Sequence, residues 1–176
     1  MEIKNKILVV DNFFNSNTLD KIKYDLSKNV FTNRFTERDN TVYQKIYFNV
    51  NLSSKHFAVK EVFEKLKKIN FKIKDIVSHY FLSTTHKEAT PHTDPNEYNC
   101  LIYLQGEHFL NSGTGFFDKI DNNYVLNSHI GFKENRAIIF DSDISHCSLQ
   151  FDSNSAKRYV MANFINNPRK EDKKSV

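Results

Sequence analysis

The hydrophobic pattern in the first third of this 176-residue chain predicts two helices and two strands. In two segments, apolar residues recur every three or four positions, which is typical of helices that bury one face. These positions are Leu19, Ile22 and Leu26 in the first segment and Val59, Val62, Phe63 and Leu66 in the second. Residues 7–10 and 41–50 are rich in β-branched and aromatic side chains, so we expect strands there. Polar residues at positions 15–17 are available to cap the first helix.

From residue 71 onward, the pattern changes to short apolar runs separated by turn residues. The predicted strands are 73–83, 99–104, 115–117, 124–126, 136–140, 146–149 and 159–165. Many short strands at regular spacing indicate a sandwich or a barrel, and the jelly roll is one such arrangement. All four glycines of the chain fall in this part, and we expect them in tight turns between the strands.

Length and composition indicate one globular domain. A chain of 176 residues with 39% hydrophobic residues, including 16 phenylalanines, can bury a sizeable core. Part of the formal charge of +4 is local, because residues 167–176 carry four basic and two acidic side chains. We therefore expect a single domain over residues 1–166, with its β-roll at about 71–165, and a basic flexible tail over 167–176. Such a tail is more often solvated than bound to nucleic acid or a membrane.

The spacing of the cysteines and the length of the apolar runs indicate the cellular compartment of the protein. Cys100 and Cys147 have neither a CxxC nor a zinc-like spacing, which favours two free thiols in a reducing cytosol. The apolar run at residues 7–10 is too short for a signal peptide, and no other run can span a bilayer. We therefore expect a soluble, cytoplasmic protein without a membrane partner. The abundance of Lys, Asn, Ile and Phe hints at an AT-rich genome; if that genome is viral, the compartment is the host cytoplasm.

The segment Pro91-His92-Thr93-Asp94 carries the strongest indication of chemistry. Residues two apart in an extended chain point to the same side, so His92 and Asp94 can bind one ion together. A second histidine, His146, follows about fifty residues later, at the start of another predicted strand. Two histidines and one carboxylate on one side of a metal form the facial triad of non-haem Fe(II) oxygenases. The tripeptide alone is also compatible with a surface turn capped by Asp94, so the metal interpretation depends on its context.

Arg158 stands at the head of the last apolar strand, where Val160, Ala162 and Phe164 share its face. Burying an arginine on an apolar face is costly unless an anion pairs with it. A carboxylate ligand would do so through two parallel hydrogen bonds, which suit the planar guanidinium group. The alternative is an arginine whose charged head extends to solvent at the strand end.

Tyr103 is a second candidate for the same carboxylate. In the strand predicted at 99–104, Asn99, Leu101 and Tyr103 share one face. If this face points into the roll, the Tyr103 hydroxyl can donate a further hydrogen bond to the ligand. A core tyrosine with some other partner is the alternative.

Three stretches together resemble the Fe(II)/2-oxoglutarate-dependent dioxygenase superfamily, and most of all its prolyl-4-hydroxylase-like branch. They read PHTDPNEYNCLIYLQ, RAIIFDSDISH and KRYVMANFI, and the resemblance covers roughly residues 76–165. It implies an α+β, mostly β fold: a double-stranded β-helix, or jelly roll, with N-terminal helices packed on one sheet. It also implies that the catalytic residues His92, Asp94 and His146 bind Fe(II). For 2-oxoglutarate, the implied residues are Arg158, Tyr103, Leu101 and, more weakly, Tyr80.

The resemblance implies a hydroxylase that uses O2 and converts 2-oxoglutarate, its cosubstrate, to succinate and CO2; ascorbate accompanies some enzymes of this kind. The substrate is left open among a protein prolyl side chain, an amino acid and a small metabolite, and the oligomeric state is open too. A non-catalytic cupin-like binding module is the first alternative. A nucleic-acid demethylase ranks lower, because the lysines are scattered rather than clustered near the metal motif.

Three details refine the resemblance. Asp94 is retained, which argues against the halogenase variants, in which a small residue stands at this position. The gap between His146 and Arg158 is longer than is common in the branch, so we expect the loop at 152–157 to bulge. Residues 112–116 resemble the Gly-Gly-Thr-Gly turn of some small members, with serine in the first place.

Overall fold

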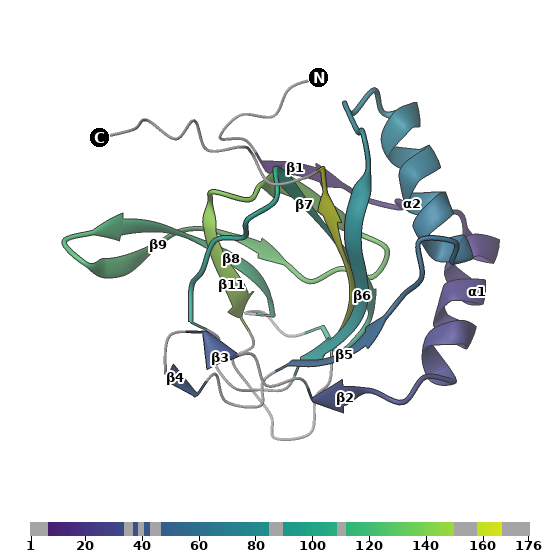
Figure 1. Cartoon of the computed structure of the whole chain (residues 1–176), viewed down its shortest axis with the longest axis horizontal. Helices are drawn as coiled ribbons and strands as arrows, with labels where there is room; N and C mark the ends of the chain where they lie inside the picture. The colour runs from purple at the N-terminus through teal and green to yellow at the C-terminus, as the bar shows by residue number, and fades with distance from the viewer. Residues whose placement is uncertain are drawn as a thin grey trace.

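Two antiparallel sheets form a roll, and two helices cover the outer face of the larger sheet (Figure 1). The computed structural model describes residues 7–33, 37–38, 41–42, 47–84, 90–108, 112–149 and 158–166. The large sheet has the strand order β1-β10-β7-β12-β6-β5-β2. Its strands are β1 (Ile7–Val10), β2 (Thr32–Asn33), β5 (Tyr47–Asn51), β6 (Ile76–Thr84), β7 (Tyr98–Gln105), β10 (Ala137–Asp141) and β12 (Arg158–Ile165).

The helices α1 (Ser16–Ser27) and α2 (Phe57–Lys68) form where the apolar spacing predicts them. Asn15 caps α1, because its side-chain oxygen accepts a hydrogen bond from the backbone N–H of Thr18 at 2.8 Å. Both helices bury their apolar faces against the large sheet, on the side away from β8 and β11 (Figure 1). Neither of these described helices has the length and the apolar run that crossing a bilayer requires.

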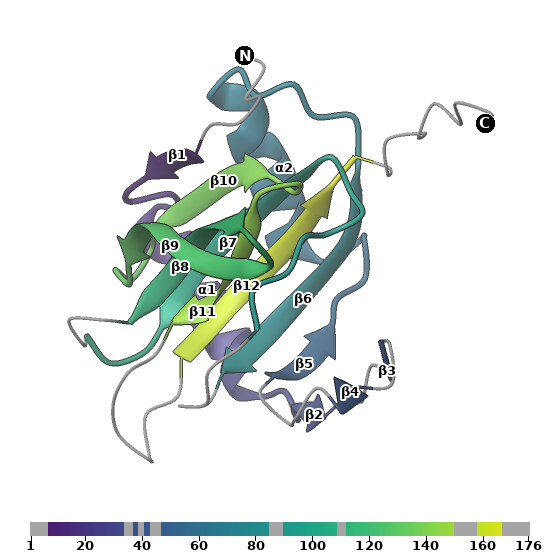
Figure 2. The same cartoon turned by 90° about the vertical axis from the view of Figure 1, so that its left-hand side faces the viewer.

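The small sheet has the order β11-β8-β9 and closes the roll over the large sheet (Figure 2). Its strands are β8 (Gly113–Ile120), β9 (Asn123–Gly131) and β11 (Ser145–Leu149). β8 and β9 are longer than the strands predicted at 115–117 and 124–126. Side chains near the tip of this hairpin are exposed on both faces, so the sequence there lacks the alternation by which a half-buried strand is found.

The expectation that the glycines lie in turns between strands is wrong for three of them. Gly113 and Gly115 lie within β8, and Gly131 is the last residue of β9. A Cβ atom on Gly115 would come within 2.6 Å of Cδ1 of Leu149 on the neighbouring strand β11. Gly115 therefore allows β11, the strand that carries His146, to approach β8 closely.

Three sequence predictions fall partly or wholly outside the described residues. The strand predicted at 41–50 is found as β4 (Thr41–Val42), which pairs with β3 (Glu37–Arg38), and as β5, whereas residues 43–46 are not described. The loop predicted to bulge at 152–157 and the tail at 167–176 also lie outside the described residues.

Residues along β7 and β12 alternate between the two faces of the large sheet, as their spacing predicts. Tyr103 lies opposite Val160, and Leu101 lies opposite Ala162. Tyr103 and Val160 pack with Phe116 of the small sheet, so this face forms the interior of the roll. The intervening residues pack beneath the helices. The fold is therefore the predicted jelly roll with N-terminal helices on one sheet.

Asn135 joins the segment before α1 to the turn before β10. Its Oδ1 accepts a hydrogen bond from the backbone N–H of Phe14 at 2.8 Å, its Nδ2 donates to the Phe14 carbonyl at 2.8 Å, and its φ is +62°. We expect Asn135→Gly to lower the free energy of unfolding by about 1–3 kcal/mol, because both hydrogen bonds are lost while the backbone conformation is kept. Asn135→Ala should lower it by about 1 kcal/mol more, since alanine disfavours positive φ. Urea denaturation tests both values, and a glycine variant as stable as the wild type would contradict this role.

Candidate metal centre and anion pocket

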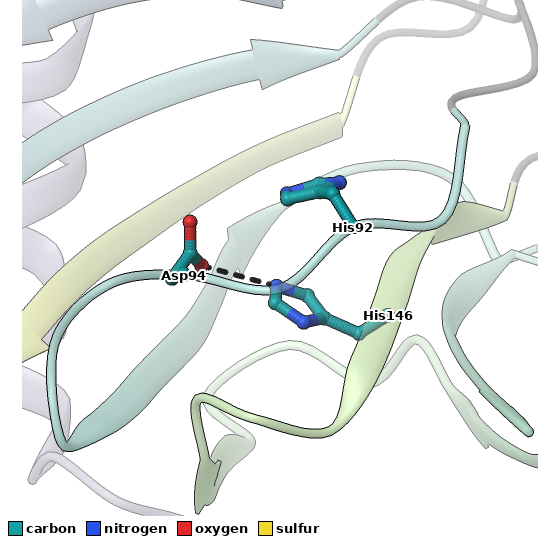
Figure 3. Close-up of side chains that lie close together, drawn as sticks. All are labelled: His92, Asp94 and His146. Carbon is teal, nitrogen blue, oxygen red and sulfur yellow. Dashed lines mark ion pairs between the residues drawn. The ribbon is translucent and has the colours of Figure 1, made fainter. Parts of the chain in front are cut away.

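His92, Asp94 and His146 come together where the segment before β7 pairs with β11 in an antiparallel bridge (Figure 3). One potential ligand atom from each residue lies within 4.8 Å of the other two. Two backbone hydrogen bonds hold the segment to β11: His92 N–H donates to the His146 carbonyl at 3.0 Å, and His146 N–H donates to the His92 carbonyl at 2.9 Å. This pairing places the two imidazole ring centres 4.7 Å apart. Chain segments about fifty residues apart thus contribute side chains to one cluster.

Backbone carbonyls hold both imidazoles in the same tautomer. The Nδ1 atom of His92 lies 3.0 Å from the Thr90 carbonyl oxygen, and that of His146 lies 2.9 Å from the Ile144 carbonyl oxygen. Because a carbonyl oxygen can only accept a hydrogen bond, each Nδ1 must carry a proton. The Nε2 atom of each neutral ring then presents its lone pair to a metal. A carbonyl partner on the remote nitrogen is typical of metal-binding histidines.

Asp94 supplies a negative charge to this cluster. Its side chain is 12% exposed, and its Oδ2 lies 3.3 Å from Nε2 of His146, as the dashed line in Figure 3 marks. Burial by itself raises the pKa of Asp94. A hydrogen bond from a protonated His146, the positive charge of both histidines when they are protonated, and a hydrogen bond from Asn99 together hold that pKa below its ordinary value. The carboxylate is therefore ionised at neutral pH.

This donor set fits a divalent iron ion. Two imidazole nitrogens and one carboxylate oxygen on one side of an octahedral metal leave the other coordination positions open. Adjacent ligands with bonds of about 2.1 Å are about 3 Å apart, and Asp94 Oδ2 and His146 Nε2 are 3.3 Å apart. A carboxylate oxygen and a nitrogen lone pair that face each other this closely require a proton or a metal ion between them.

Arg158 lies buried at the start of β12, with 3% of its surface exposed. Its guanidinium group donates to the Gly113 carbonyl at 2.5 Å and to the hydroxyl of Ser148. Its Cζ atom lies 5.3 Å from the ring centre of Tyr103. The alternative in which the charged head extends to solvent is therefore wrong. We give the name anion pocket to Arg158, Tyr103 and Ser148 as a candidate carboxylate site, because a planar guanidinium group can pair with a carboxylate through two parallel hydrogen bonds.

The anion pocket adjoins the metal cluster along β11. Ser148, which Arg158 contacts, follows His146 by two residues on the same face of this strand. Two residues of extended chain span about 7 Å. The backbone positions of His146 and of Ser148, the partner of Arg158, therefore lie about this far apart along one strand.

The Tyr103 hydroxyl already has partners on the small sheet. It lies 2.7 Å from Oγ1 of Thr114 and donates to the Ile130 carbonyl at 3.3 Å. Burial raises the pKa of Tyr103, against the opposing charge of Arg158. The hydroxyl therefore stays protonated, and its single hydrogen is engaged by the Ile130 carbonyl.

Leu101 and Tyr80 form one row across the interior face, because each lies opposite Ala162 of β12. This row runs between the row of Tyr103, at the anion pocket, and the row of Asn99, which contacts Asp94. Tyr80 packs edge-on against Phe164, with ring centres 5.8 Å apart. Ala162 is four residues, or about 13 Å, along β12 from Arg158. Leu101 and Tyr80 thus lie on the interior face between the rows of Tyr103 and Asn99, and neither contacts the guanidinium group through a described hydrogen bond.

Two polar residues of the site were missed by sequence reasoning. Asn99 donates to Oδ2 of Asp94 at 2.7 Å, and Ser148 accepts a hydrogen bond from Arg158. Both stand on inward faces of strands, where a polar side chain needs a partner. This inward polarity is the signal by which they could have been found.

Solved structures with similar folds resemble the chain over most of its length. A prolyl hydroxylase from Trichoplax adhaerens, in complex with a hypoxia inducible factor peptide fragment, has a TM-score of 0.63 at 14% identity, covering 93% of this chain and 84% of that one. A Pseudomonas putida prolyl-4-hydroxylase has a TM-score of 0.61 at 10% identity, covering 93% and 94%. The chain has the fold of these hydroxylases. HygX from Streptomyces hygroscopicus, with nickel and 2-oxoglutarate bound, has a TM-score of 0.64 at 10% identity, covering 93% and 83%.

The fold of these solved structures agrees with the jelly roll that the resemblance implies. Sequence comparison does not assign a family, since no family model matches the chain. No curated protein matches it either. At identities of 10–14%, the likeness to the solved structures is one of backbone architecture, and the chemistry has to be argued from the residues of this chain.

Proposed function

We propose that this protein is an Fe(II)- and 2-oxoglutarate-dependent oxygenase that hydroxylates an organic substrate. The observation that carries the proposal is the clustering of His92, Asp94 and His146 within 4.8 Å inside a hydroxylase-like roll. The buried Arg158, beside the same strand, supports it. When bound, iron, 2-oxoglutarate and O2 supply the oxidant, and the products are the hydroxylated substrate, succinate and CO2.

The chain's own residues would bind and orient these groups. His92, Asp94 and His146 would hold Fe(II) through two Nε2 atoms and a carboxylate oxygen. Arg158 would pair with the far carboxylate of 2-oxoglutarate, and Tyr103 would turn its hydroxyl hydrogen from the Ile130 carbonyl to the same carboxylate. The row of Leu101 and Tyr80 would line the space between the two sites and limit access of water there.

Measuring succinate release distinguishes a catalytic hydroxylase from a non-catalytic binding module. We expect purified protein with Fe(II), 2-oxoglutarate, O2 and ascorbate to release succinate when a proline-containing peptide, an amino-acid mixture or a metabolite mixture is added. An Asp94→Ala variant is the matched control and should release none above background. Metal and 2-oxoglutarate binding without succinate release from any substrate class would contradict catalysis and favour the binding module.

Both small molecules and peptides are compatible with the proposed reaction as substrates. One similar structure was solved with a hypoxia inducible factor peptide fragment, and HygX was solved with hygromycin B. These ligands are chemically unlike, so the shared roll does not select one class. We propose a cytoplasmic enzyme, in line with Cys100, a buried cysteine present as a thiol.

A further inference from the structure

A chain of buried polar side chains leads away from the Asp94 carboxylate. Asn99 Nδ2 donates to Asp94 Oδ2 at 2.7 Å, and Asn96 Nδ2 lies 2.9 Å from Asn99 Oδ1 and 2.8 Å from Ser142 Oγ. Asn99 is 1% exposed, Asn96 7% and Ser142 0%. We call Asn99, Asn96 and Ser142 the amide chain. None of the three belongs to the metal cluster or to the anion pocket.

The charge of Asp94 sets the direction of every hydrogen bond in the amide chain. An ionised carboxylate can only accept, so Asn99 must present its NH2 group to Asp94. The carbonyl oxygen of Asn99 then faces Asn96, which in turn must present its own NH2 group. Nδ2 of Asn96 is surrounded by acceptors, since the Tyr98 carbonyl is a third neighbour. The opposite amide orientation would place oxygen against oxygen, so the network has one consistent arrangement.

The same residues fix the backbone of the metal-binding segment. Asp94 N–H donates to the Ser142 carbonyl at 3.0 Å, and Ser142 N–H donates to the Glu97 carbonyl at 3.2 Å. Asn99 itself lies on β7, which is paired on both sides, by β10 and by β12. Asp94 is therefore held at its main chain by the turn before β11 and at its carboxylate by a central strand.

We propose that Asn99 is a positioning residue that aims the Asp94 carboxylate at Nε2 of His146 before a metal binds. This inference rests on the proposed function, because it takes Asp94 as a metal ligand. A carboxylate that is already oriented loses less freedom on binding, which raises affinity. Hydrogen-bond partners of metal ligands typically contribute 10–100-fold to metal affinity. We expect a loss of about this size when Asn99 can no longer donate.

The test compares Mn(II) affinity in two variants that each lose one buried asparagine. Asn99→Leu keeps the branching and the number of side-chain heavy atoms and removes the donor to Asp94, and Asn99→Ala serves if leucine prevents folding. Asn163→Leu is the matched control, because Asn163 is also 1% exposed but lies on the helix-facing side of β12 and donates to the Cys100 carbonyl at 3.2 Å. We expect about 10–100-fold weaker Mn(II) binding by calorimetry for the Asn99 variant only. The Mn(II) electron paramagnetic resonance spectrum at saturation should also change only for that variant.

The possible outcomes separate this inference from the proposed function. Wild-type affinity in Asn99→Leu, with wild-type protein that binds Mn(II), would overturn the positioning role and leave the metal centre intact. Equal losses in the Asn99 and Asn163 variants, tracking their thermal unfolding temperatures, would also overturn it, because the effect would then be one of general stability. A wild-type protein that binds no Mn(II) would overturn both proposals.

Discussion

Replacing Asp94 with alanine should weaken Fe(II) or Mn(II) binding by more than about 100-fold and abolish succinate release. The estimate follows because loss of a ligand must exceed the 10–100-fold typical of losing a ligand's hydrogen-bond partner. Asp94 is also the one negative charge in the cluster, so its loss leaves two neutral imidazoles to hold a dication. Isothermal calorimetry with Mn(II) under anaerobic conditions measures the affinity.

Two further variants test whether the loss of metal affinity in Asp94→Ala comes from the cluster itself. His146→Ala should have the same effect, since it removes an imidazole from the same 4.8 Å cluster. His108→Ala is the control, because His108 is exposed and meets the Phe132 ring edge-on, outside the cluster. The metal-free unfolding temperature of each variant shows whether folding is intact. Metal affinity that survives in folded Asp94→Ala would show that the ion binds elsewhere.

Replacing Arg158 with alanine should weaken 2-oxoglutarate binding by about 30-fold or more while leaving Mn(II) binding unchanged. Truncating one partner of a buried, hydrogen-bonded charge pair costs about 2–5 kcal/mol, and each 1.4 kcal/mol is tenfold in affinity. The guanidinium group is buried and does not contact the metal ligands through any described hydrogen bond. The two affinities should therefore separate.

A lysine variant separates the contribution of the Arg158 charge to 2-oxoglutarate affinity from that of its planar donor pair. Arg158→Lys keeps the positive charge but loses the planar donor pair, so its affinity for 2-oxoglutarate should fall between those of the wild type and the alanine variant. Arg136→Ala is the control, because Arg136 pairs with Asp11 at 2.7 Å near the surface. It should alter stability without altering 2-oxoglutarate affinity. Equal 2-oxoglutarate affinity in wild type and folded Arg158→Ala would remove Arg158 from the pocket.

Alternation along strands made much of the interior predictable from sequence. The period of two placed Leu101 and Tyr103 on the inward face, and Arg158 with the apolar residues of β12, as the register confirms. The same period predicted that His92 and Asp94 share a side. The His92 N–H donates a hydrogen bond to the His146 carbonyl on β11. This pairing of segments that are distant in the sequence follows from the roll and not from any local pattern.

The contacts that hold the candidate metal ligands in place were harder to predict, because they join segments that are far apart in the sequence. β1 pairs with β10 across about 130 residues of sequence, and the amide chain joins Asn96 and Asn99 to Ser142. Asparagine and serine are common in turns, so their identity alone does not separate a buried hydrogen-bonding role from a loop role. The glycines of β8 misled for a related reason, since Gly115 is required by the close approach of Leu149 and not by a turn.

If His92, Asp94, His146 and Arg158 hold Fe(II) and 2-oxoglutarate in one site, bound 2-oxoglutarate should change the visible absorbance of the iron. The measurement adds 2-oxoglutarate to anaerobic wild-type protein loaded with Fe(II). We expect a metal-to-ligand charge-transfer band, which should be absent in Asp94→Ala and should require more 2-oxoglutarate in Arg158→Ala. Wild-type protein that shows no band at saturating Fe(II) and 2-oxoglutarate would show that the two do not bind in one site.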